Sequence, residues 1–199
     1  MPSHYFIFDT SALVFRYIRP SDREGEFIKD QVDALFAARA KRSNSIVFQL
    51  PNICMAECSK VFAWACFDQN MYGVSKRDAV NAYTNLRDAL LKDVSRDRII
   101  NSYEFKSDHL VGIEDIFTRD YNELPRPDPK KKGKRLSAHD ALIIAIASAI
   151  AFDHAGGLEN TTLVTAEKRM SLMCLKFPES YPHAVNVRYD GVQSRLTGL

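Results

Sequence analysis

The sequence of 199 residues predicts an α/β fold, in which a mainly parallel central sheet lies between two layers of helices. Short runs rich in β-branched and aromatic residues alternate with longer segments of helical character along the whole chain. Repeated β-α alternation joins parallel strands through helices that cover both faces of the sheet. With 46% hydrophobic and 26% charged residues, the composition is that of an ordinary globular protein, and we expect one domain over residues 1–199.

The expected elements follow from local patterns. Aromatic and β-branched runs predict strands near residues 4–9, 46–49, 98–103, 161–165 and 184–189. Helices are expected to start near residue 11 and to span about 24–41, 76–92, 107–119, 137–151 and 167–175. A further helix is expected to open at Pro51, because proline is tolerated in a first helical turn.

A basic loop is expected at about 124–136. Three prolines, a glycine and a run of like charges disfavour packed structure there. The stretch 126–135 carries six basic residues and one acid, a net charge of +5 that leaves −3 on the rest of the chain. Such a loop could hold a phosphate backbone, or it could be a solvated loop without a ligand. The residues expected to contact RNA are Lys130, Lys131, Lys132, Lys134 and Arg135.

Several classes of protein fit the sequence poorly. Asp9 interrupts the first apolar run, which argues against a signal peptide, and the apolar helix 141–151 is shorter than the roughly 20 residues of a membrane span. We therefore expect a cytoplasmic protein without a membrane contact. The four cysteines form no disulfide framework and no zinc motif, and we expect small buried side chains at Cys54, Cys58, Cys66 and Cys174.

Asp9 is the first of four acidic residues that point to a functional site. It follows a strand-like run and precedes Thr10 and Ser11, which favour a helix start. In an α/β sheet this junction lies at the edge where ligands usually bind. The alternative is a helix-capping role, although Thr10 and Ser11 could cap the helix equally well.

Glu57 and Asp140 interrupt apolar helices. Glu57 falls in one sector of its helix with Ile53, Val61 and Trp64, where a carboxylate needs a compensating cation. The alternative partner for Glu57 is Lys60.

Asp140 starts a helix that is apolar on every side, and the alternative there is a capping box with Ser137. Glu167 follows the strand that ends at Thr165. The alternative there is an acid in the first turn of the next helix that interacts favourably with the helix dipole. His139 could be a ligand or a proton carrier, but scattered histidines more often lie on surfaces.

These residues, in this order, resemble the PIN-domain nucleases. The first motif is the run from Asp9 to Leu13, Asp-Thr-Ser-Ala-Leu, and the second is Glu57 on the helix after the second strand. Asp140 matches the acid that opens an Ala/Ile-rich helix, and Thr165-Ala166-Glu167 stands where the family commonly has Thr-x-Asp. The resemblance covers about residues 4–190. The chain departs from the family by carrying Glu at position 167 and by its extra length around 68–135.

The resemblance implies a PIN-like α/β/α sandwich and a metal-dependent ribonuclease. Clustered carboxylates repel one another until Mg²⁺ or Mn²⁺ neutralises them, and such ions activate water for phosphodiester hydrolysis. The implied metal ligands are Asp9, Glu57 and Asp140, with Glu167 as a fourth catalytic acid. Ser11 and Thr165 would orient ligands through their hydroxyl groups. RNA is the implied substrate.

The sequence can be compared with three other functions. A PIN-like module could bind RNA or a protein partner with weak or no catalysis, and the glutamate at position 167 favours that alternative. A toxin would have an antitoxin-like partner, and family members often form homodimers. A phosphatase of the haloacid-dehalogenase type would need a second aspartate where Ser11 stands, which argues against it.

Overall fold

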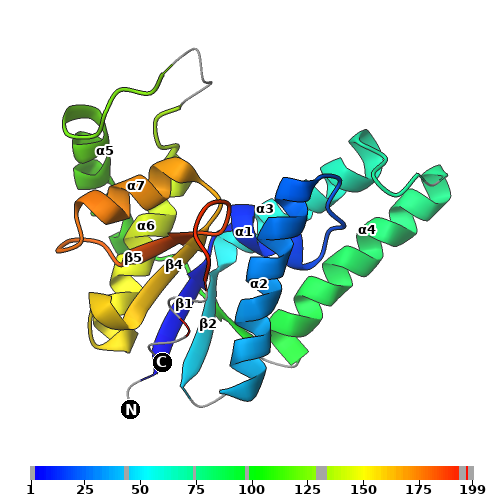
Figure 1. Cartoon of the computed structure of the whole chain (residues 1–199), viewed down its shortest axis with the longest axis horizontal. Coiled ribbons are helices and arrows are strands. Elements are labelled where there is room, and N and C mark those ends of the chain that lie inside the picture. Colours follow the sequence, from blue (N-terminus) through cyan, green and yellow to red (C-terminus); the bar gives the residue numbers. More distant parts are fainter. Residues whose placement is uncertain are drawn as a thin grey trace.

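The protein is a three-layer α/β/α structure around a five-stranded sheet in which every strand pair is parallel (Figure 1). The computed structural model describes residues 3–42, 45–73, 75–96, 99–128, 134–192 and 196. The strand order is β3-β2-β1-β4-β5. The strands are β1 His4–Phe8, β2 Ile46–Pro51, β3 Ile100–Tyr103, β4 Thr161–Thr165 and β5 His183–Asn186. The predicted fold class is therefore confirmed.

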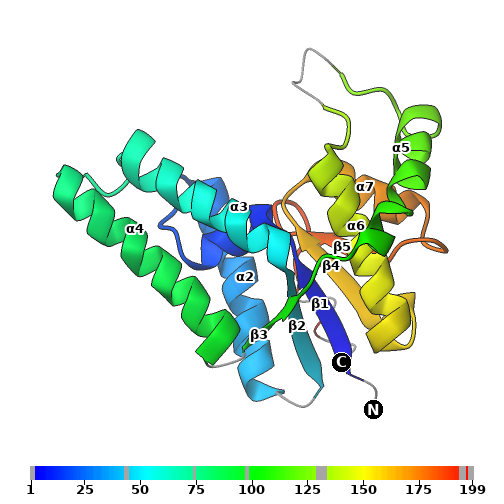
Figure 2. The same ribbon diagram turned by 180° about the vertical axis from the view of Figure 1, so that it is seen from behind.

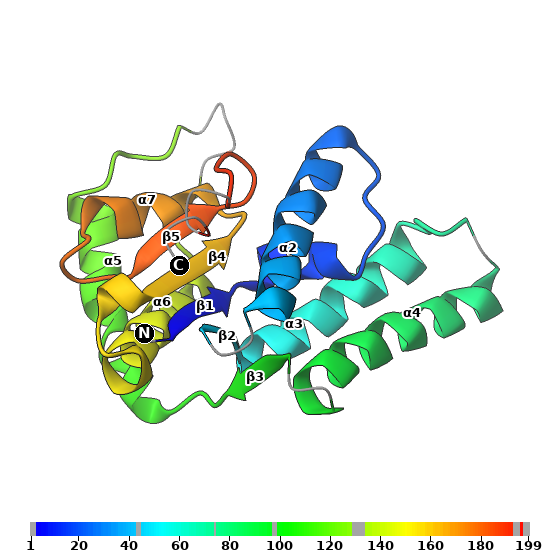
Figure 3. The same cartoon turned by 60° about the horizontal axis from the view of Figure 1, so that its bottom comes forward.

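Helices cover both faces of the sheet. In Figure 1 α2 lies on the near side of β2, and in the opposite view of Figure 2 α6 lies on the near side of β1 and β4. Figure 3 shows α5, α6 and α7 gathered beside β4 and β5, with α2, α3 and α4 on the side of β2. The helices are α1 Thr10–Leu13, α2 Arg23–Lys41, α3 Asn52–Ala63, α4 Lys76–Leu91, α5 Ile113–Asn122, α6 Ala138–Ile150 and α7 Lys168–Lys176.

The core between α2 and the sheet is built from aromatic rings. Phe8 on β1 and Phe48 on β2 lie edge to face with centroids 5.0 Å apart, and Phe36 of α2 packs against both. Burying each such side chain stabilises the fold by about 1.5–3 kcal/mol. The central position of β1 follows from its sequence, because Phe6, Ile7 and Phe8 are buried on both faces.

Three expected elements differ from those observed. Pro51 ends β2 and caps α3 instead of standing in the first helical turn. The helix expected over 107–119 is divided, because a 3₁₀ turn at Ser107–Leu110 precedes α5, which begins after Gly112. The last strand stops at Asn186, whose side-chain and backbone oxygens accept the amides of Arg188 and Tyr189 in a turn.

Helix α6 continues through a π-helical turn at Ala151–Ala155. The stretch Ala138–Ala155 has a mean hydropathy of 1.3 and is long and apolar enough to cross a membrane by length and composition alone. Half of it is buried inside the domain, as in a core helix. The expectation of no membrane contact therefore stays a prediction. The four cysteines are free and buried, as expected.

Candidate carboxylate site

The candidate site lies where the chain changes direction within the sheet. From β1 the chain goes to β2 and β3 on one side, and only later returns to β4 and β5 on the other. Asp9 directly follows β1, and Thr165 ends the adjacent strand β4. In open α/β sheets, ligands bind at such a switch point beyond the carboxyl ends of the strands.

Asp9 is a buried acid that does not cap its helix. Only 3% of the residue is exposed, and it stands at the N-cap position of α1 without a side-chain capping bond. Its carboxylate accepts hydrogen bonds from the hydroxyls of Ser11 and Thr165, the latter at 2.8 Å. The capping alternative for Asp9 is therefore wrong.

Ser11 and Thr165 join the ends of β1 and β4. Besides donating to Asp9, the Ser11 hydroxyl accepts the amide of Ala166 at 2.9 Å. The Thr165 hydroxyl accepts the amide of Glu167 at 2.9 Å. Each hydroxyl therefore donates its proton to Asp9 and accepts a hydrogen bond from a backbone amide. These two bonds fix the orientation of both hydroxyl groups.

The surroundings of Asp9 raise the pKa of its carboxyl group. Burial raises the pKa of Asp9 from 3.8 to about 6. The hydrogen bonds from Ser11 and Thr165 act in the opposite direction, and the negative charges of Asp140 and Glu57 raise the pKa further. The structure therefore brings three of the four sequence-predicted acids within electrostatic reach of one another.

Glu57 lies at the rim of the site and not in a buried stripe. The buried face of α3 consists of Cys54, Cys58 and Phe62, whereas the Glu57 side chain is 39% exposed. The Glu57 carboxylate pairs with His139 Nδ1 of α6 at 3.3 Å, where the sequence suggested Lys60. The apolar sector that Glu57 shares with its hydrophobic neighbours is not a buried stripe, because Trp64 is itself exposed.

Asp140 has two roles that do not conflict. It forms the capping box that was the alternative at this position, with the Ser137 amide donating to Asp140 Oδ2 at 2.9 Å. The Asp140 amide in turn donates to the Ser137 hydroxyl at 3.1 Å. The cap holds the carboxylate at the start of α6, from which its charge acts on Asp9.

Glu167 and His139 each differ from expectation. Glu167 precedes α7 with extended backbone angles, its side chain makes no capping bond, and the residue is exposed. Its charge is not among the largest influences on Asp9. His139, in contrast, enters the site through Glu57, and its buried Nε2 atom has no hydrogen-bond partner among the described residues. In the sequence, its place beside Asp140 was the only signal.

The basic loop is described only in part. Lys130, Lys131 and Lys132 lie outside the described residues, and Lys134 is exposed. Arg135 already has partners, because its guanidinium pairs with buried Asp120 at 3.8 Å and lies over the Tyr121 ring at 4.6 Å. A phosphate contact by these basic residues stays a prediction, and the geometry of Arg135 favours a structural role.

The donor set of the site suits a hard divalent cation in chemical terms. Carboxylate oxygens are the ligands that Mg²⁺ prefers, and Asp9 is a buried acid with the charges of Asp140 and Glu57 within electrostatic reach. Within the described part of the chain, however, no group of three or more His, Cys, Asp or Glu side chains is arranged closely enough to hold a metal ion. The residues fit the chemistry, but their side chains do not form a closed ligand cage.

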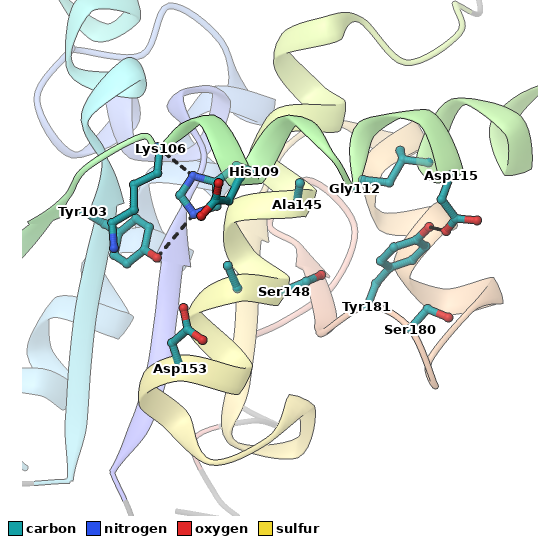
Figure 4. A pocket seen from close by; sticks show the side chains of 13 residues that line it. Tyr103, Lys106, His109, Gly112, Asp115, Ala145, Ser148, Asp153, Ser180 and Tyr181 are labelled. Atoms are coloured by element: carbon teal, nitrogen blue, oxygen red, sulfur yellow. Dashed lines mark hydrogen bonds between the residues drawn. The ribbon is translucent and has the colours of Figure 1, made fainter.

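Two cavities lie elsewhere on the protein. One of about 360 Å³ opens between the segment 103–116 and α6, with Tyr103, His109 and Ser148 in its wall (Figure 4). The other, of about 640 Å³, lies between α2 and the end of α3, beside Trp64. None of the four predicted acids lines either cavity.

Comparisons with known proteins leave the chain without an assigned family. No model of a known protein family matches it, and no curated protein matches it. Among solved structures it is similar to the crystal structure of VapBC2 from Rickettsia felis bound to a DNA fragment from their promoter. That likeness has a TM-score of 0.45 and 15% identity, and it covers 91% of this chain and 97% of the other. A likeness at this level transfers neither a family nor a function.

Proposed function

We propose that the protein is a PIN-like, metal-dependent ribonuclease whose centre is formed by Asp9, Glu57 and Asp140. The single observation that carries the proposal is the environment of Asp9, a buried carboxylate with a raised pKa beside two further carboxylates. Asp9 follows β1 at the switch point of the all-parallel sheet, and this position supports a centre there. Uncompensated buried charge is costly, and a bound cation would remove that cost.

Each proposed ligand is held by a neighbour. Ser11 and Thr165 hold the Asp9 carboxylate, His139 contacts Glu57, and Ser137 fixes Asp140. A bound Mg²⁺ or Mn²⁺ ion lowers the pKa of a coordinated water and stabilises negative charge that develops on phosphate. The protein's own contribution is to hold the carboxylates in a fixed orientation through these neighbours. Glu167, exposed after β4, would position water or a second ion.

The substrate we propose is RNA, in a cytoplasmic protein. The basic residues of the segment 124–136 would contact phosphates and give affinity that falls with salt. Lys134 is exposed and suits such a contact, whereas Arg135 is paired with Asp120. Lys134→Gln should weaken RNA binding and flatten its salt dependence. Equal binding and an equal salt slope in the variant would remove Lys134 from the proposal.

Cleavage of a mixed set of labelled RNAs tests the proposal directly. Wild type, Asp9→Asn and Asp140→Asn are compared with Mg²⁺, with Mn²⁺ and with EDTA. Asparagine at position 140 still offers an oxygen to the Ser137 amide, so the cap of α6 survives while the charge is lost. We expect metal-dependent cutting that falls at least about 100-fold in both variants. Cutting in EDTA, or equal cutting by the variants, would contradict the proposal.

The second candidate is a PIN-like module that binds RNA or a protein without useful cleavage. The exposed, uncapped side chain of Glu167 favours it, because the fourth acid stands apart from the groups that act on Asp9. Folded protein that binds RNA but cuts none of the set under any metal condition would support this candidate. Either candidate function is compatible with a homodimer and with an antitoxin-like protein partner. Light scattering of the protein, expressed alone and together with a candidate partner protein, would detect both.

A further inference from the structure

We propose that Asp120, far from the carboxylates in sequence, is a positioning residue for the candidate site. It lies in the last turn of α5 and is fully buried, with 0% of its side chain exposed. No sequence pattern singles out Asp120. The inference rests on the proposed metal centre and extends it to the residues that hold its helices in place.

Asp120 binds two arginines from different parts of the chain. Its Oδ1 atom accepts from Arg169 Nε at 2.5 Å, and its Oδ2 atom lies 3.8 Å from Arg135 Nη1. The backbone carbonyl of Asp120 accepts hydrogen bonds from both guanidinium groups. The bond from Arg169 Nη2 measures 3.0 Å. These bonds also satisfy a carbonyl at the end of α5 that has no partner within the helix.

The two arginines sit at the starts of the helices that carry site residues. Arg169 is in the first turn of α7, two residues after Glu167, and also donates to the Pro125 carbonyl at 2.7 Å. Arg135 precedes the Ser137 cap of α6 by two residues, and the Leu136 amide between them donates to Asp120 Oδ2 at 3.4 Å. One buried carboxylate thus fixes the beginnings of both α6 and α7.

The charges are placed against the helix dipoles. A carboxylate is disfavoured at a helix C-terminus and a guanidinium at a helix N-terminus, yet Asp120 and Arg169 occupy those ends of α5 and α7. Neither charge is stabilised by its own helix, so each depends on the other. An apolar contact would hold α5 equally well, whereas the ion cluster fixes two helix ends in one geometry.

The test compares three variants with wild type. Asp120→Asn removes the charge, and Asp120→Asn combined with Arg169→Gln removes the pair without leaving Arg169 charged and buried. Asp115→Asn is the matched control. Asp115 lies on the same helix and also has an arginine partner, Arg119, but its other contact is Tyr181, away from the starts of α6 and α7.

Two readouts that need no RNA decide the outcome. Hydrogen exchange of the Asp140 and Glu167 amides, which bond to Ser137 and Thr165, reports the first turn of α6 and the end of β4. Mn²⁺ affinity, from electron paramagnetic resonance, reports the site. In the double variant, shown to be folded by circular dichroism, we expect about tenfold faster exchange and about tenfold weaker Mn²⁺ binding. Asp115→Asn should match wild type in both.

Three results would overturn the proposal. Unchanged exchange or unchanged Mn²⁺ affinity in the folded double variant would make the cluster a stabilising contact only. Equal losses in Asp115→Asn would assign the effect to general loosening of α5. Wild type that binds no Mn²⁺ would overturn the metal centre together with the role of Asp120. Wild type that binds Mn²⁺ but cuts no RNA would overturn only the nuclease, since both readouts remain valid.

Discussion

Asp9 and Asp120 are both buried aspartates, but their surroundings are opposite. Asp9 accepts hydrogen bonds from two hydroxyls, which lower its pKa. Burial and the charges of two further acids outweigh them and raise the pKa of Asp9 to about 6. Asp120 is completely enclosed and lies between two arginines. Both sites bury negative charge, and at Asp120 two arginines supply the compensating positive charge.

Under the proposed function, the difference separates a structural charge from a functional one. A buried ion pair balances its own desolvation within the fold, so its loss changes stability. A buried acid grouped with other acids costs stability, and this cost persists in a protein when the group serves binding or catalysis. The contrast predicts opposite effects of neutralising the two residues.

The largest effect on stability is expected at Asp120. Asp120→Ala leaves the Arg169 guanidinium, only 14% exposed, without its carboxylate, and should lower the free energy of unfolding by about 3–5 kcal/mol. Denaturant unfolding measures this loss. The control is Asp33→Ala, because Asp33 also pairs with two basic residues, Arg16 and Lys29, but is 36% exposed. We expect about 1 kcal/mol or less there. Similar losses at both positions would erase the contrast.

Asp9→Asn should have the opposite sign. Because the folded-state pKa of Asp9 is raised from 3.8 to about 6, the folded state binds more protons between these values, and wild-type stability falls as pH rises through them. Above pH 6 the ionised group costs up to about 3 kcal/mol. The variant should therefore be more stable than wild type at pH 7.5 in EDTA, with little difference at pH 4.

A divalent cation should reverse this order. Saturating Mn²⁺ at pH 7.5 should raise the melting temperature of wild type and leave that of Asp9→Asn nearly unchanged, since only the charged site gains from binding. Differential scanning calorimetry with and without Mn²⁺ checks this outcome. A variant that is less stable than wild type at pH 7.5 without metal would show that Asp9 is structurally compensated after all.

The smallest effect on stability is expected at the Glu57–His139 pair. The two side chains are 39% and 30% exposed, so His139→Gln should change the free energy of unfolding by less than about 1 kcal/mol. Cleavage should still fall by about tenfold, because Glu57 loses the group that orients it. Arg87→Gln, which breaks the exposed pair with Asp88 on α4, is the control for both measurements. A stability loss like that of Asp120→Ala would place His139 among the structural residues.

Local patterns predicted the parts of the molecule that depend on neighbours in the chain. The strand before Asp9, the capping box of Ser137 and Asp140, and the Thr165 strand each follow from a few adjacent residues. The helix expected over 107–119 was less well predicted, since Gly112 ends one turn and α5 begins after it. The helical pattern expected over residues 107–119 continues through this break, which only the backbone geometry reveals.

The sequence by itself determined the alternation of strands and helices, the positions of Asp9, Asp140 and Glu167 at or near the ends of elements, and the position of Glu57 within a helix. Hydrophobic periodicity and helix capping are local, so they can be derived without coordinates. Only the tertiary structure decided which charges meet. Asp120 on α5 meets Arg169 on α7 and Arg135 in the segment before α6, and Glu57 meets His139 across two helices. Packing of distant segments determines whether a carboxylate is exposed, paired or left without compensation, because burial and partners depend on three-dimensional proximity.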